Sequence, residues 1–141
     1  MAVTIDLGEW NDIHPLNKED VGKRLSLLAR KLAYGERKLQ ASSPMPSTSR
    51  FKKDKAVVSF KNIGGGLIVK DGTELKSFAI SNDGKNFVWA KAKIMGDKVT
   101  VWNEKISNPI MVRYAWDNNP EEANLYSKEG SPATPFELKK E

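Results

Sequence analysis

The spacing of apolar residues changes near residue 40, and this change divides the chain into two unlike parts. Within residues 21–32, apolar side chains recur at the spacing of one helical face: Val21, Leu25, Leu28, Ala29 and Leu32. Beyond residue 55, short runs with a period of two are separated by turn residues, as in β-strands. The sequence therefore predicts a strand–loop–helix unit followed by a small β domain.

The first unit has clear start and stop signals. Residues 2–7 (AVTIDL) predict a short buried strand, and Asn17 is a good N-cap for the helix that follows. Gly35 is a plausible helix terminator. Because one strand and one helix cannot bury a two-sided core, we interpret residues 1–35 as the end of something larger.

The second part predicts six strands: 56–60, 66–69, 77–81, 86–95, 98–102 and 110–116. Glycine, asparagine, aspartate and proline residues mark the turns between them, which is typical of an antiparallel sandwich or barrel. We expect a mainly β fold, with a jelly-roll or immunoglobulin-like β-sandwich over 56–136. Residues 36–55 would be a linker, and 137–141 a tail.

The dipeptide Gly96-Asp97 predicts a two-residue hairpin turn. The paired residues would be Met95 with Lys98, Ile94 with Val99, Lys93 with Thr100, Ala92 with Val101 and Lys91 with Trp102. One face would belong to the core: Val88, Ala90, Ala92, Ile94, Val99 and Val101. The other face would carry Phe87, Trp89, Lys91 and Trp102.

Trp89 and Trp102 would then form an aromatic patch on the face that should be polar. Loops or the tail of the same domain could cover it, or a neighbouring domain could dock there. Alternatively, the patch is a platform that stacks a sugar or a base. Under that interpretation, Trp89 and Trp102 are candidate substrate-binding residues.

Composition narrows the chemistry of this 141-residue, 15.8 kDa chain. It has no cysteine and one histidine, so we expect neither disulfides nor a zinc site, and no cofactor. No apolar run has the length of about 20 residues that spans a bilayer, so we expect no membrane partner. The first ten residues have no signal-peptide pattern.

The net charge of +5 comes from basic residues that are scattered along the chain. Nucleic-acid binders concentrate basic residues on one stripe with interleaved aromatics. We therefore expect a basic soluble surface and no nucleic-acid partner.

The single histidine, His14, lies in the loop between the predicted strand and the predicted helix. It could be structural or merely exposed. Alternatively it is a general base, because sites gather where the strands of open α/β sheets end. Such a base needs a nucleophile, yet the chain contains no G-x-S-x-G motif. The chain therefore carries at most part of a catalytic set.

Four stretches resemble the C-terminal part of the sialate O-acetylesterases, carbohydrate esterases of the SGNH hydrolase superfamily: TIDLGEWNDIHPLNKEDVGKRLSLLARKLAYGE, NIGGGLIV, ELKSFAIS and VRYAWDNNPEEANLYSKEGSPATPF. The resemblance implies a flavodoxin-like domain whose last strand, loop and helix are residues 1–35, and a β-sandwich after it. It also implies that His14 is the catalytic histidine, and that the serine and the oxyanion-hole donors lie upstream.

The resemblance further implies that O-acetyl groups are removed from sialic acid or a related acetylated glycan by a serine esterase. This chain alone would be inactive, with the upstream domain of the same polypeptide as its partner. The superfamily pattern D-x-x-H would put the orienting acid at position 11, where this chain has Asn11; Asp12 is the carboxylate present. The substrate suggests a periplasmic or extracellular parent protein. The alternative function is an independent β-sandwich module that binds carbohydrate or a protein.

Overall fold

One helix and ten strands form the regular structure of residues 1–140, which the computed structural model describes. The helix is α1 (Lys18–Leu32). The strands are β1 (Met45–Phe51), β2 (Lys55–Lys61), β3 (Leu67–Val69), β4 (Phe78–Ser81), β5 (Val88–Trp89), β6 (Lys91–Met95), β7 (Lys98–Trp102), β8 (Met111–Tyr114), β9 (Leu125–Ser127) and β10 (Phe136–Lys139). With 34% strand and 11% helix, the protein is mainly β, as the sequence predicted.

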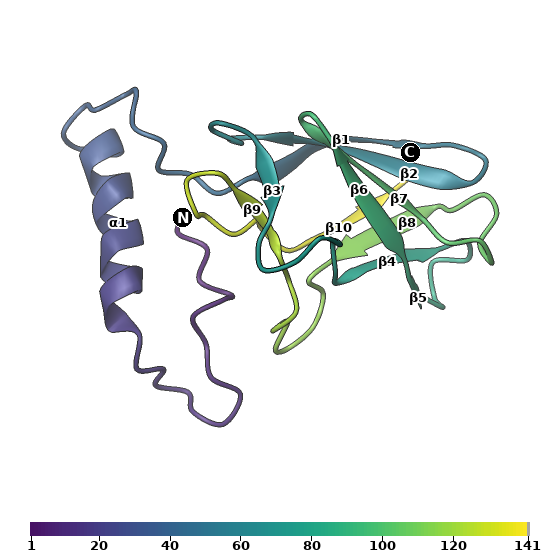
Figure 1. Cartoon of the computed structure of the whole chain (residues 1–141), viewed down its shortest axis with the longest axis horizontal. Helices are drawn as coiled ribbons and strands as arrows, with labels where there is room; N and C mark the ends of the chain where they lie inside the picture. The colour runs from purple at the N-terminus through teal and green to yellow at the C-terminus, as the bar shows by residue number, and fades with distance from the viewer. Residues whose placement is uncertain (141) are drawn as a thin grey trace.

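The strands form two four-stranded antiparallel sheets around one core (Figure 1). Their orders are β1-β2-β7-β6 and β10-β8-β4-β5, and β3 pairs with β9 in a small third sheet. More and less buried side chains alternate along the strands, and the buried ones form the core. Val58 on β2, Val101 on β7 and Val112 on β8 have no exposed surface. This arrangement is the predicted antiparallel sandwich rather than a barrel.

Aromatic rings fill the middle of the core. The ring centroids of Phe78 and Tyr114 lie 4.6 Å apart, and Phe136 packs against both rings. The Tyr114 hydroxyl accepts a hydrogen bond of 2.9 Å from the backbone N–H of Leu125. Leu125 is fully buried, so the irregular C-terminal stretch is fastened to the core at this residue.

The predicted hairpin between β6 and β7 has the expected register throughout. Gly96 adopts φ 65°, which suits glycine in the first position of the turn. However, the predicted strand 86–95 is divided. β5 pairs with β4 in one sheet, whereas β6 pairs with β7 in the other. Trp89 and Trp102 therefore lie on different sheets, because the chain changes sheet at Ala90.

A further difference concerns residues 36–55, which the sequence predicted to be a linker. β1 occupies 45–51 of this segment and pairs with β2 at the edge of the first sheet. Its sequence, MPSTSRF, has no alternation of apolar and polar residues. An edge strand does not need that alternation, because backbone hydrogen bonds alone can hold it. At the other end, β10 extends to Lys139, into the predicted tail.

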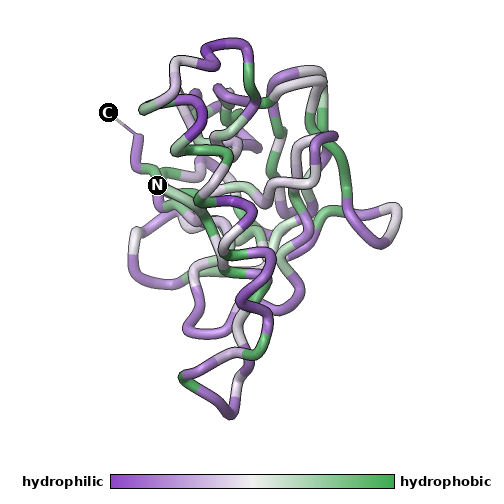
Figure 2. The backbone as a smooth tube through the Cα atoms, turned by 90° about the vertical axis from the view of Figure 1, so that its left-hand side faces the viewer, coloured by the Kyte–Doolittle hydropathy of each residue, from purple (hydrophilic) through white to green (hydrophobic). Residues whose placement is uncertain are grey.

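The predicted helix is confirmed, and Asn17 caps it by accepting a hydrogen bond of 3.1 Å from the backbone N–H of Asp20. α1 stands to one side of the sheets (Figure 1) and has no buried residue. In Figure 2, where this side faces the viewer, hydrophobic and hydrophilic positions are intermingled along the chain.

The predicted strand over residues 2–7 is wrong. This segment runs extended and then turns, with the Leu7 N–H donating to the Thr4 carbonyl at 3.1 Å. A strand requires a hydrogen-bonded neighbour, and no strand within residues 1–140 pairs with this segment.

Within the described residues, no helix combines the length and the apolar character that crossing a membrane requires.

Candidate functional site

The loop that carries His14 is held together by its own two carboxylates. Asp12 Oδ1 accepts a hydrogen bond of 2.7 Å from the backbone N–H of His14, and Glu9 Oε1 accepts one of 2.9 Å from Leu16 N–H. Asp12 therefore bonds the histidine's backbone rather than its imidazole. Among residues 1–140, no hydrogen bond to the His14 side chain is found, and the residue is exposed.

A cleft of about 790 Å³ lies between this loop and the β domain. One wall consists of Thr4, Ile5 and residues 8–10, and the opposite wall consists of residues 115–120 with Pro135. His14 does not line the cleft itself, but the residues that begin its loop do. The lining offers carboxylates, side-chain amides and two tryptophans, Trp10 and Trp116, and contains no serine.

The β-domain wall is a tightly bonded loop. Ala115 adopts a positive φ of 48° and donates its N–H to the Ser77 carbonyl at 2.9 Å. Further on, Asp117 Oδ1 accepts from Asn118 N–H at 2.6 Å, and the Asn119 amide donates to Glu121 at 2.8 Å. This loop was not predicted, because the predicted strand 110–116 included Ala115 and Trp116, whereas β8 ends at Tyr114. The available signal was the run of three hydrogen-bonding residues 117–119 directly after Trp116.

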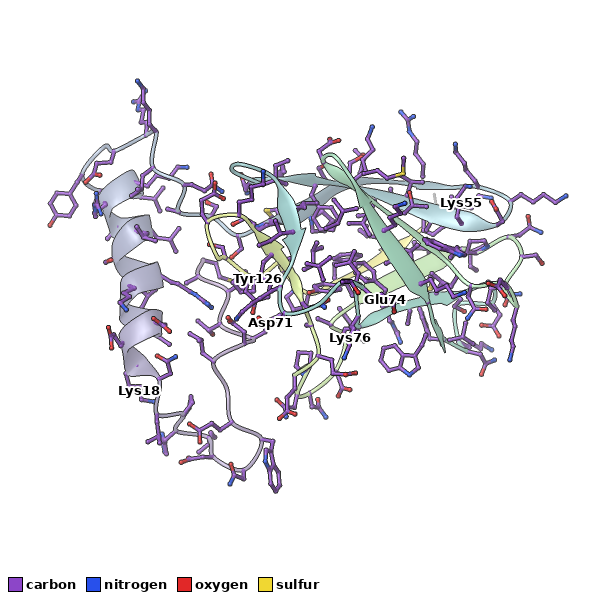
Figure 3. The ribbon with its side chains drawn as sticks, in the orientation of Figure 1. Lys18, Lys55, Asp71, Glu74, Lys76 and Tyr126 are labelled. Carbon is purple, nitrogen blue, oxygen red and sulfur yellow. The ribbon has the colours of Figure 1, made fainter. Side chains whose placement is uncertain are left out.

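An ion pair fixes the N-terminal segment against both α1 and the β domain. The Arg24 guanidinium donates to both Asp6 carboxylate oxygens at 2.6 and 2.7 Å, and its Nη1 also donates to the Val3 carbonyl at 2.7 Å. From β9, the Tyr126 hydroxyl donates to Asp6 Oδ2 at 2.9 Å. Figure 3 shows Tyr126 on the side of the sandwich that faces the N-terminal segment.

The electrostatics of Asp6 reflect these contacts. Burial raises the pKa of its carboxyl, but hydrogen bonds from Arg24 and Tyr126 and the charge of Arg24 outweigh burial, so the net pKa lies below the usual value. Asp6 is therefore ionised at neutral pH. Because the Tyr126 hydroxyl joins this ion pair to the β domain, the contact helps to set the position of the His14 loop relative to residues 115–120.

The two tryptophans of the predicted aromatic patch, Trp89 and Trp102, have different surroundings. Trp89 is 71% exposed and borders a hollow of about 260 Å³ together with Phe87, Arg113 and Trp116. Trp102 is half-buried on the first sheet, paired with Lys55 and Lys91. Trp89 and Trp116 thus line one hollow, and Trp102 is not part of its lining.

The described residues supply a base and polar groups near the cleft. Within residues 1–140, no group of three or more histidine, cysteine, aspartate or glutamate side chains could hold a metal ion. An imidazole such as that of His14 can accept or donate a proton. The cleft can bind a polar ligand against the ring faces of Trp10 and Trp116.

Comparison with known proteins shows what the chain is similar to. No family model matches it. The sialate O-acetylesterases of Pongo abelii and Homo sapiens are each 27% identical over 148 residues, and that of Mus musculus is 29% identical over 149 residues. Each alignment covers 96% of this chain but only 27–28% of the relative.

A solved structure is more similar. The crystal structure of a carbohydrate acetylesterase from Xanthomonas citri superposes with a TM-score of 0.93 at 42% sequence identity. The match covers 97% of this chain and 32% of that one. The predicted resemblance to the sialate O-acetylesterases is therefore confirmed over nearly the whole chain, and its relatives are carbohydrate esterases.

Proposed function

We propose that this chain is the C-terminal part of a carbohydrate esterase that removes O-acetyl groups from sialic acid or a related acetylated glycan. The similarity to sialate O-acetylesterases over 96% of the chain carries the proposal. Since the chain spans little more than a quarter of those relatives, the proposal assigns the serine nucleophile and the oxyanion-hole donors to an upstream SGNH-type α/β domain of the same polypeptide.

In this mechanism His14 is the general base. Its imidazole takes the proton of the serine hydroxyl as the serine oxygen attacks the acetyl carbonyl, and upstream donors stabilise the oxyanion. His14 then donates that proton to the departing sugar oxygen, which leaves an acetyl-serine. Water, deprotonated by His14, then attacks the acetyl carbonyl; acetate leaves as His14 returns the proton to the serine oxygen, which regenerates the serine. The sugar occupies the cleft between the His14 loop and residues 115–120.

Asp12 has a different role in this proposal from that of an orienting acid. Its carboxylate accepts the His14 backbone N–H and so shapes the loop. The group that orients the imidazole then lies in the upstream domain, as an acid or a backbone carbonyl.

Apolar residues of the N-terminal unit support the proposal of an upstream domain. Ile13 is 89% exposed and Leu32 77%, and both would be covered by the remainder of an α/β domain. The chain alone is then inactive, because it has a base without its nucleophile. The substrate class is also our reason for proposing that the parent protein works in the periplasm or outside the cell.

The direct test is His14→Ala in the longer protein, with acetyl-ester hydrolysis as the readout. Loss of the base is expected to lower kcat by several orders of magnitude. Added imidazole should restore part of the activity, because it supplies the missing base. Lys98→Ala, on the exposed face of the first sheet, is the control and should leave kcat unchanged. Normal turnover of His14→Ala would overturn the assignment.

A further inference from the structure

Three of the four tryptophans are more than half exposed, and all three line two adjoining hollows. The exposed fractions are 78% for Trp10, 71% for Trp89 and 56% for Trp116. A single exposed apolar side chain is ordinary, whereas several large rings gathered on one surface mark a binding site.

Strand register explains how the smaller hollow forms. Glu137, Arg113, Ala79 and Trp89 lie in one row across β10, β8, β4 and β5. Ala79 is small, so a depression remains between the long side chains of Arg113 and Trp89. Phe87 and Trp116 complete its walls, and the Arg113 guanidinium lies 3.6 Å from the Phe87 ring centroid and 5.5 Å from that of Trp116. The volume of this hollow is about 260 Å³.

The hollow combines ring faces with hydrogen-bonding groups. Arg113 Nε donates to Glu137 Oε2 at 2.5 Å, and the two Nη atoms make no hydrogen bond to any of residues 1–140. Asp117 also lines the hollow. Two carboxylates therefore balance the single guanidinium, so there is no excess positive charge to attract an anion.

A neutral sugar unit fits this chemistry. One face of a pyranose carries C–H groups that pack on an indole ring, while its hydroxyls reach the Nη donors of Arg113 and the carboxylate of Asp117. The carboxylate of an acidic sugar would be repelled by Asp117 and Glu137, because these two residues already balance the charge of Arg113.

The hollow also borders the cleft at the His14 loop. Trp116 and Asp117 line both, and the cleft extends from them to Gly8, Glu9 and Trp10. The positive φ of Ala115, directly before Trp116, is a conformation that costs a non-glycine residue free energy. Such conformations gather at binding sites, and this one directs the chain out of β8 between the two hollows.

We propose that the hollow of Phe87, Trp89, Arg113 and Trp116 is a subsite for a neutral sugar unit of the glycan that carries the acetylated sugar. This inference rests on the proposed function and extends it: the substrate is an acetylated oligosaccharide or polysaccharide, not a free acetylated monosaccharide.

The test is a tryptophan-fluorescence titration of the 141-residue chain with lactose, sialyllactose, free N-acetylneuraminic acid and neutral tetrasaccharides of glucose, mannose, xylose and N-acetylglucosamine. We expect saturable binding of at least one neutral or neutral-ended oligosaccharide, and much weaker binding of the free acid sugar. Trp89→Ala should weaken that binding about tenfold or more, as loss of a central aromatic contact does. Trp102→Ala is the matched control and should leave the affinity unchanged.

Arg113→Gln provides a second variant that keeps all three rings, and we expect it to weaken binding without altering the far-UV circular dichroism. The inference is overturned if no oligosaccharide binds saturably, if Trp102→Ala weakens binding as much as Trp89→Ala, or if only the acid sugar binds. This readout does not depend on esterase activity. If no oligosaccharide binds but His14→Ala abolishes turnover, the proposed function stands without this subsite.

Discussion

The two parts of the molecule contain similar apolar residues, but these are buried in the sandwich and largely exposed in the N-terminal unit. In the sandwich, Val58, Val99 and Val101 have no exposed surface, since each strand has a facing sheet. In the N-terminal unit, Leu16 is 82% exposed and Leu32 77%. An amphipathic pattern therefore predicts a helix or strand locally, but its burial depends on which elements lie opposite.

Ile5 packs against the sandwich core, and polar contacts provide the other link between the two parts, whereas the sandwich itself is held together by packing. Asp6, Arg24 and Tyr126 form the polar link, and the side chains of Asp6 and Arg24 are only 13% and 18% exposed. A link of this kind depends on charge, whereas the sandwich core does not.

Truncating one apolar residue in each part should show the largest difference. Phe78→Ala removes a ring that is 1% exposed and should lower the free energy of unfolding of the sandwich by about 3–5 kcal/mol. Leu32→Ala removes an exposed side chain and should change it by no more than about 0.5 kcal/mol. Urea denaturation of both variants measures the difference, and equal effects would show that α1 is packed as firmly as the sandwich.

The polar link should have the next largest effect. Asp6→Asn removes the charge that Arg24 binds, and should lower the free energy of opening residues 1–35 by about 1–3 kcal/mol. Hydrogen exchange of this segment measures that opening. The exposed pair Arg30–Glu36 provides the control: Glu36→Gln should change the exchange little. Faster exchange throughout the sandwich in Asp6→Asn would contradict a purely local role.

The same link should depend on pH. Because the pKa of Asp6 is lowered in the folded protein, its stabilising contribution is present above the unfolded pKa, about 3.9, and is lost as pH falls through the lower folded value. Hydrogen exchange of residues 1–35 should accordingly speed up, relative to the sandwich, below about pH 4. The Asp6→Asn variant should lack this acid-dependent step.

The smallest effect is expected at Asp12. Asn at this position can still accept the His14 backbone N–H, so Asp12→Asn in the longer protein should change kcat only a few-fold. Asp12→Ala, which removes the acceptor, should be worse. A loss in Asp12→Asn as large as that in His14→Ala would make Asp12 the orienting acid after all.

Local signals explain which parts of the fold could be predicted. The cap at Asn17 and the turn at Gly96 act within a few residues, and both α1 and the β6–β7 register follow from them. The strand over 2–7 failed because pairing requires a distant partner. β1 was missed because its pairing partner β2, not its own sequence, holds it.

The site was predictable to a similar extent. His14 lies in an exposed loop before a helix, as its sequence position indicated. The opposite wall of the cleft comes from residues 115–120, about a hundred positions away, and the bond from Tyr126 to Asp6 spans 120 positions. Contacts between residues so far apart in the sequence depend on the sandwich topology, which local turn residues do not determine.

The most direct test of the account is the size of the natural polypeptide that contains this sequence. An antibody raised against the β domain, used on a blot of the source cells, reports it. We predict a band several times larger than 15.8 kDa, with a serine nucleophile upstream of these residues. A band near 15.8 kDa would contradict this prediction, because His14 would then have no serine in a nucleophile motif in the same polypeptide, and the chain would be a binding module.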